Sequence, residues 1–191
     1  MVRNDPSSSL RKLSRERPTF NELMQKHELY HALDDRAFAI MQGADLEAAL
    51  DDAIAHRLNL SRPVITQLFH SSESALTFSA KILIGKAANL YGQGTVNDMN
   101  VIRDVRNAFA HAQKPIGFGT KEVSDVCGKL LIVPMIVGDF GPPPILKGVP
   151  PGPRFFYGRT CEGFASLLTM TTRTDPAQRE SDYKEGDAVL P

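Results

Sequence analysis

Three polar side chains in the stretch RDVRNAFAHA are of the types that cleave an RNA backbone without a metal. Such cleavage needs a group that moves protons and a cation that stabilises charge on the phosphate. Imidazole is the side chain that titrates nearest neutrality, so His111 could move the proton, while Arg106 could hold the phosphate and Asn107 could orient either group. At about 100° per residue, Arg106 lies about 140° round the helix from His111. A single phosphate can contact both Arg106 and His111 only if the arginine side chain extends around the helix, the end of the helix unwinds, or a second copy of the chain supplies one of the two residues.

The same three residues also have a structural interpretation. Arg106 could form an ion pair inside the bundle, Asn107 could satisfy a buried backbone group, and His111 could stabilise the carboxyl end of its helix. The acids that could pair with Arg106 are Asp98, Asp104 and Glu47. An arginine followed five residues later by a histidine occurs by chance in many chains. The spacing by itself leaves both interpretations open.

A second polar set lies upstream of this stretch. Arg36 and Glu47 are eleven residues apart, which is about three helical turns and places both on nearly the same face. Lys81, in FSAKI, is expected to point toward that face, and Asp104 is a further candidate member. Together they could extend a phosphate or ligand pocket around Arg106 and His111, or form a buried ion network that fixes the register of the helices.

The segment HELYH, residues 27–31, matches the zinc-protease pattern of two histidines one helical turn apart with a glutamate between them. Such a site requires a third ligand, and no further histidine follows His31 at the usual spacing. The downstream acids are explained by the amphipathic pattern of their own helix. We therefore expect a solvent-facing helix here, and neither a metal nor any other cofactor.

Composition and charge limit the partners of the chain. It has 191 residues, 42% of them hydrophobic, and 22 basic residues balance 22 acidic ones, so no net field draws it to nucleic acid or to an anionic membrane. The only cysteines, Cys127 and Cys161, are far apart in the sequence. The longest apolar run, LLIVPMIVG, is about half of a membrane span and is interrupted by Pro134. We expect a cytoplasmic protein that does not enter a membrane.

Hydrophobic periodicity predicts an all-α fold, a helical bundle between two irregular ends. Residues 1–18 form a flexible basic arm, residues 19–137 the helical domain, and residues 138–191 a Pro/Gly-rich, largely irregular extension. Within this extension, RFFYGRTCEGFASLLTM is apolar enough to pack back on the helices. The expected helices are 19–33 with Thr19 as N-cap, 34–60 as one helix or two split near Gly43, 74–92 ending at Gly92, 95–112 beginning at Thr95 or Asn97, and 120–131 with Thr120 as N-cap.

Residues 68–112, LFHSSESALTFSAKILIGKAANLYGQGTVNDMNVIRDVRNAFAHA, resemble the core of the mannitol operon repressor family, in which a TFSAKI-type helix precedes an IR.IRN.FAH motif. The upstream pair Asp35 and Arg36 and the LE..L pattern of 46–50 are also similar, so the resemblance covers about residues 34–131. The stretch LIGKAANLYG departs from the family pattern. The resemblance implies a non-enzymatic regulatory protein that forms homodimers.

More remotely, RNAFAH resembles the motif of the HEPN superfamily of helical domains, many of which are metal-independent endoribonucleases that act as dimers. This resemblance implies that Arg106, Asn107 and His111 line a cleft at a two-fold axis, which would also solve the angular problem described above. It covers one short motif and a fold class. A ribonuclease is therefore the alternative to the regulatory function.

Direct DNA reading needs an exposed recognition helix surrounded by a basic face. The helix containing VNDMNVIRDVRNAF is mixed in charge, and its polar residues are expected to be partly buried. We expect regulation of transcription through a protein partner, with RNA as a further possible partner, rather than sequence-specific DNA binding.

Overall fold

The computed structural model describes residues 22, 25–26, 29–30, 32–71, 75–131 and 151–172. They belong to two compact units, residues 1–34 and residues 35–191. In the first unit the described residues from Glu22 to Tyr30 are helical, and the ammonium of Lys26 lies 5.3 Å from the ring centre of Tyr30. Thr19, His27 and His31 fall outside the described residues, so the predicted N-cap and the HELYH motif have no structural description.

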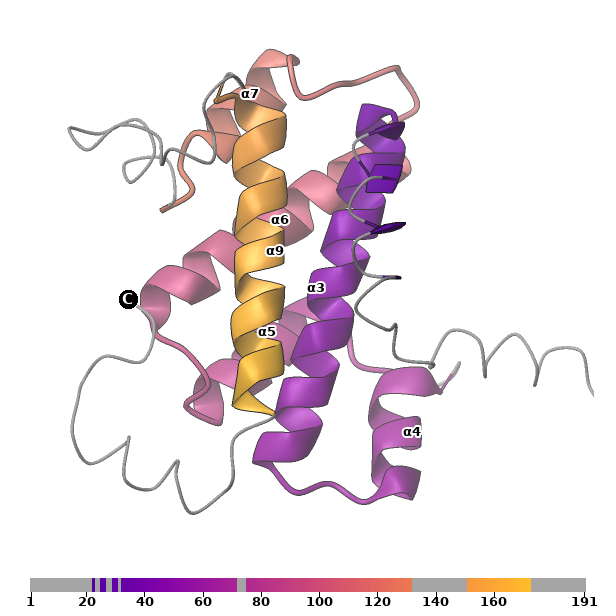
Figure 1. Cartoon of the computed structure of the whole chain (residues 1–191), viewed down its shortest axis with the longest axis vertical. Coiled ribbons are helices and arrows are strands. Elements are labelled where there is room, and N and C mark those ends of the chain that lie inside the picture. Colours follow the sequence, from indigo (N-terminus) through magenta and orange to yellow (C-terminus); the bar gives the residue numbers. More distant parts are fainter. Residues whose placement is uncertain are drawn as a thin grey trace, which may run out of the picture. The chain divides into compact units, whose positions relative to one another are not determined.

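The second unit is built from helices, and the described residues contain no strand. This result confirms the predicted all-α fold. In chain order the helices are α3 (Asp35–Arg57), α4 (Arg62–His70), α5 (Phe78–Ala87), α6 (Gln93–His111), α7 (Lys121–Cys127) and α9 (Pro153–Thr171), as Figure 1 shows.

Helix α3 contributes a buried apolar stripe to the core. Leu46, Leu50 and Ile54 recur at helical spacing and are completely or almost completely buried. The helix is continuous through Gly43, so the alternative of two helices split at this glycine is wrong. Leu58, expected on the same stripe, lies just beyond the helix end and is 47% exposed.

Aromatic side chains join α3 and α6 to the loop before α7 and to α9. The ring of Phe118 lies 5.0 Å from Phe109, 5.4 Å from Tyr157 and 6.0 Å from Phe38, measured between ring centres. Phe109 and Tyr157 are fully buried. These rings form the core at the end of the bundle where α6 ends.

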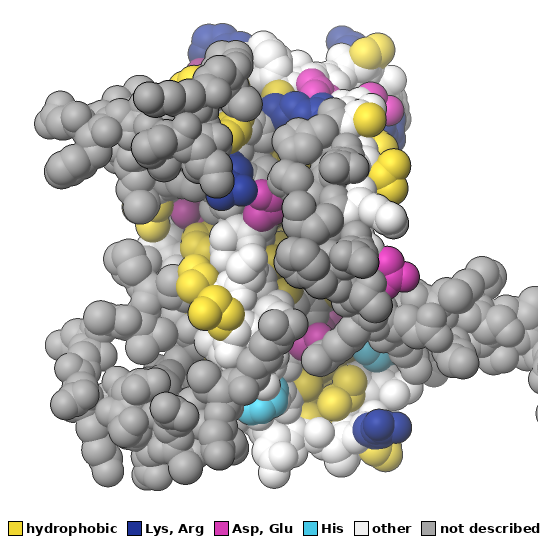
Figure 2. Space-filling view, viewed as in Figure 1, with side chains coloured by type: hydrophobic (Ala, Val, Ile, Leu, Met, Phe, Trp, Pro, Cys, Tyr) yellow, Lys and Arg dark blue, Asp and Glu magenta, His cyan; other side chains and the backbone are white. Residues whose placement is uncertain are grey.

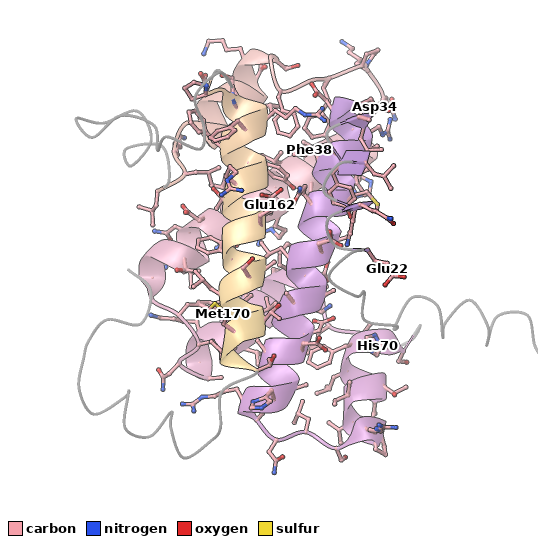
Figure 3. The ribbon with its side chains drawn as sticks, viewed as in Figure 1. Glu22, Asp34, Phe38, His70, Glu162 and Met170 are labelled. Carbon is pink, nitrogen blue, oxygen red and sulfur yellow. The ribbon has the colours of Figure 1, made fainter. Side chains whose placement is uncertain are left out.

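Helix α9 packs along α3 over much of its length (Figure 1). A Cβ atom at Gly158 would lie 2.6 Å from Cζ of Phe38, so the glycine permits the close approach of the two helices; Figure 3 labels Phe38 on α3. The expectation that RFFYGRTCEGFASLLTM packs back is confirmed. Its helical form was not expected in a largely irregular extension, although Gly152 as N-cap and Pro153 at the first position are ordinary signs of a helix start.

Two helices end on an asparagine in the left-handed conformation. Asn59 has φ 49° after α3, and Asn89 has φ 54° after α5. The next amides, of Leu60 and Leu90, donate to carbonyls five residues back at 2.9 and 3.0 Å, which is the Schellman arrangement. The predicted cap at Gly92 is therefore wrong. Asparagine supplies the left-handed residue three positions earlier, and Gly92 is instead the N-cap of α6 with φ −83°.

Helix α4 was not predicted. Ser61 is its N-cap, a proline lies in its first turn, and Phe69 is its one buried residue. Thr120 is the N-cap of α7 as predicted, and its hydroxyl accepts a hydrogen bond from the amide of Gly117 at 3.0 Å. The predicted arm, residues 1–18, lies outside the described residues. So do residues 132–150, which include most of the LLIVPMIVG run, and residues 173–191 at the end of the extension. Within the described ranges, none of the helices has the length and apolar character needed to cross a membrane.

Candidate functional site

Glu47 on α3 bridges two cations from two other helices. Its Oε2 accepts a hydrogen bond from Nη1 of Arg106 on α6 at 2.7 Å, and its Oε1 accepts from Nζ of Lys81 on α5 at 2.9 Å. Glu47 and Lys81 are 19% and 5% exposed at their side chains, so both ion pairs are largely removed from water. One carboxylate therefore links α3, α5 and α6.

Asp51, one helical turn after Glu47, completes this group. Its Oδ2 accepts from Nζ of Lys81 at 2.8 Å, while its Oδ1 is buried and has no hydrogen-bond partner among the described residues. Burial raises the pKa of Asp51 from 3.8 to about 6, against the opposing effect of the Lys81 ammonium. We call Glu47, Asp51, Lys81 and Arg106 the ion cluster.

Aromatic and aliphatic contacts hold the two cations in place. The guanidinium carbon of Arg106 lies 5.3 Å from the ring centre of Phe78, and Nζ of Lys81 lies 5.6 Å from that of Phe69. A Cβ atom at Gly43 would lie 3.0 Å from Cδ of Arg106. Arg106 therefore lies along a part of α3 that has no side chain, and its reach to Glu47 depends on this space.

The ion cluster has no net charge when its four members are ionised, because two carboxylates face two cations. A phosphate approaching Arg106 would compete with a carboxylate already at 2.7 Å. Nη2 of Arg106 also donates to Oδ1 of Asn107 at 3.3 Å. The arrangement can fix the register of three helices, and it offers an anion little uncompensated positive charge.

His111 is the last residue of α6 and is exposed to solvent. Arg36 reaches this helix end from α3, and its Nη2 donates to the carbonyl of Ala110 at 2.9 Å. A cation at a carboxyl-terminal carbonyl is favourable, so Arg36 stabilises the end of α6. Arg36 thus contacts the neighbour of His111 and is not part of the ion cluster.

Two other predicted acids have different partners. Asp104, 61% exposed at its side chain, pairs with Arg103 at 2.7 Å on the outer face of α6. Asp98 is buried and accepts hydrogen bonds from the amide of Leu131 at 3.2 and 3.3 Å. Burial raises the pKa of Asp98 from 3.8 to about 6. Of the three acids considered for Arg106, the structure therefore selects Glu47.

The structure brings together Glu47, Lys81 and Arg106 from the predicted polar set, and it adds Asp51, which the sequence analysis missed. A signal was present, because Asp51 follows Glu47 by four residues and therefore lies on the same face of α3. No group of three His, Cys, Asp or Glu side chains that could hold a metal ion is found within the described ranges.

Comparisons of this chain with protein-family models, with curated proteins and with solved structures found no significant match.

Proposed function

We propose that this chain is a non-enzymatic, cytoplasmic regulatory protein, similar to the mannitol repressor family, that acts on transcription through protein partners. We further propose that it forms a homodimer. The resemblance of residues 34–131 to that family supports the regulatory part of the proposal. The balanced charge of the chain and the mixed charge of α6 favour a protein partner over direct DNA reading.

One observation carries the non-enzymatic part of the proposal, namely the 2.7 Å contact between Arg106 and Glu47. A cation that stabilises a phosphoryl transition state must be directed at the place where charge develops. Arg106 is instead paired with a carboxylate and packed over Phe78. Its geometry supports a structural role.

A metal-independent endoribonuclease is the second candidate, and the exposure of His111 favours it. An imidazole open to solvent can reach an RNA strand, and Asn107, one helical turn earlier, is partly exposed. In this alternative Arg106 must leave Glu47 or a second copy must supply the cation.

The regulatory proposal is tested by deleting the gene in its source organism and measuring transcripts, with rescue by the native chain and by His111→Ala. We expect deletion to change the transcripts of a small set of operons, and both chains to restore them. Rescue by the native chain alone would favour the ribonuclease, and unchanged transcripts after deletion would contradict the regulatory proposal. Sedimentation of the purified chain tests the homodimer.

A further inference from the structure

Helix α4 is the least buried of the described helices of the second unit. Phe69 is its one buried residue, and Val64, Ile65 and Leu68 remain partly or largely exposed. Figure 1 shows α4 beside the carboxyl end of α3, and Figure 2 shows hydrophobic side chains at the surface of this region. In the part of the chain that the structure describes, no other helix packs along α4. A helix held by so little burial opens locally at a low cost in free energy.

The single buried side chain of α4 lies against the ion cluster. The ring centre of Phe69 is 5.6 Å from Nζ of Lys81, and this ammonium is 2.8 Å from Oδ2 of Asp51. Phe69 is 6% exposed, and the side chain of Lys81 is 5% exposed. The ring therefore keeps water from one side of the ion cluster, and the helix that carries this ring is the least buried one.

Asp51 is the member of the ion cluster that lacks a full set of partners. Its Oδ1 is buried and has no hydrogen-bond partner among the described residues, and burial raises its pKa to about 6. An ionised carboxylate with one unpaired oxygen is costly to bury, whereas the protonated form carries no charge. Movement of Phe69 away from Lys81 would admit water to this carboxylate.

The charged and titratable groups around Asp51 come from four helices, namely Lys81 (α5), Glu47 and Asp52 (α3), Arg106 (α6, through Glu47) and His70 (α4). The ring centre of His70 lies 6.4 Å from that of Phe69. Lys81 favours the ionised form of Asp51, and the two acids on α3 oppose it. Burial outweighs Lys81, so the closed cluster holds the proton of Asp51 more tightly than a hydrated carboxylate would. Loss of this proton therefore favours an open state.

We propose that α4 is a pH-dependent cover of the ion cluster, whose opening, with Phe69, is favoured when Asp51 is ionised. This inference does not rest on the proposed function. The cover turns about the left-handed Asn59, where the amide of Leu60 closes the end of α3, and Ser61 begins α4 without a side-chain cap. An open α4 exposes the ammonium and the carboxylate to water, so the burial of the ion cluster changes with pH.

Native-state hydrogen exchange of the full chain, followed by NMR at about pH 5 and about pH 7, tests this device. The probes are the amides of residues 66–70 in α4, corrected for the intrinsic exchange rate at each pH, and the amides of α6 are the internal reference. Asp51→Asn imitates the protonated acid. Asp104→Asn is the matched control, because this acid is 61% exposed and lies outside the ion cluster. Circular dichroism checks the fold of each variant.

We expect the α4 amides to exchange through an opening at least about tenfold more frequent than that of the α6 amides. The opening equilibrium of α4 should rise by up to about tenfold between the two pH values, because the pKa of Asp51 is about 6 when closed and 3.8 ordinarily. Asp51→Asn should abolish this rise, and Asp104→Asn should keep it. Equal protection of α4 and α6, or no rise with pH, would overturn the inference. So would a rise that survives Asp51→Asn, since it would belong to another group such as His70.

A second variant tests the cover itself. Phe69→Leu keeps an apolar side chain but removes the ring beside Lys81. We expect the NMR titration of the Asp51 carboxyl carbon to show its pKa moving from about 6 toward 3.8, and the α4 amides to exchange faster at both pH values. Val64→Ala, which shortens an exposed side chain of the same helix, should leave the titration unchanged. If Phe69→Leu also leaves the pKa of Asp51 unchanged, α4 does not cover the ion cluster and the inference is wrong.

Discussion

Replacing Glu47 with Gln should destabilise the protein far more than losing one surface ion pair. The change keeps the size of the side chain and one carbonyl oxygen, but it removes the carboxylate that pairs with Arg106 and leaves the 5% exposed Lys81 with Asp51 as its remaining carboxylate. Breaking a buried ion pair from one side costs about 3–5 kcal/mol. Arg106 is 24% exposed and can recruit water, which lowers the expected cost to roughly 2–4 kcal/mol.

Urea denaturation near neutral pH, followed by circular dichroism, measures this loss. For a chain of this size, 1 kcal/mol corresponds to about 2–4 °C in Tm, so a fall of roughly 4–16 °C should accompany it. Asp104→Asn is the matched control, because it removes an ion pair whose acid is 61% exposed, and it should cost at most about 1 kcal/mol. Equal losses in the two variants would refute the structural role assigned to Glu47.

A double-mutant cycle separates the pair from its surroundings. Glu47→Gln and Arg106→Gln should together cost less than the sum of the single changes, with a coupling energy of about 1–3 kcal/mol. Additive losses would mean that the 2.7 Å contact contributes little to stability.

Three further predictions concern pH, packing and a helix end. Because the pKa of Asp51 is about 6 in the folded protein and 3.8 ordinarily, the folded state holds its proton more tightly between these values. The free energy of unfolding should therefore fall as pH rises through this range, and Asp51→Asn should make that fall smaller in urea titrations at several pH values, while Asp98, whose pKa is raised to the same range, keeps part of it; an unchanged slope would contradict the buried state of Asp51. Gly43→Ala should lower stability by about 1–3 kcal/mol because the new Cβ would meet both Arg106 and the hydroxyl of Tyr157, whereas Gly163→Ala on the open side of α9 should raise it by about 0.5–1 kcal/mol. If both changes stabilise the protein, Arg106 and Tyr157 do not fill the space beside Gly43. Asn59→Ala should lower Tm measurably and Asn59→Gly should not, because only alanine resists a φ of 49°; equal Tm values would argue against the left-handed helix end.

The sequence predicted the helices best where apolar residues recur at helical spacing. Leu46, Leu50 and Ile54 on α3 are examples, and their burial agrees with the pattern. Helix α9 was missed because the prolines and glycines before it favour an irregular chain, while its burial depends on contact with α3, far away in the sequence. Helix α4 is short, and one buried residue gives a weak periodic signal.

The candidate site shows the same division between local pattern and tertiary contact. Glu47 and Lys81 were grouped correctly with Arg106, but Arg36 was not. Arg36 and Glu47 share a face of α3, yet the eleven residues between them place them about 16 Å apart along the helix axis. Asp104 is two residues from Arg106, about 160° away around α6, and so faces solvent. Which acid meets Arg106 is decided by the packing of α3 on α6, which no local spacing encodes.

The most direct test of the central claim, that Arg106 is a structural and not a catalytic group, is cleavage of a mixed single-stranded RNA pool in the presence of a chelator. The native chain, Glu47→Gln and His111→Ala are compared at matched purity and with verified fold. We predict no cleavage by any of them, including Glu47→Gln, in which Arg106 has lost its carboxylate partner. Products with 2′,3′-cyclic phosphate ends that appear with the native chain or increase with Glu47→Gln, and that disappear with His111→Ala, would contradict the claim.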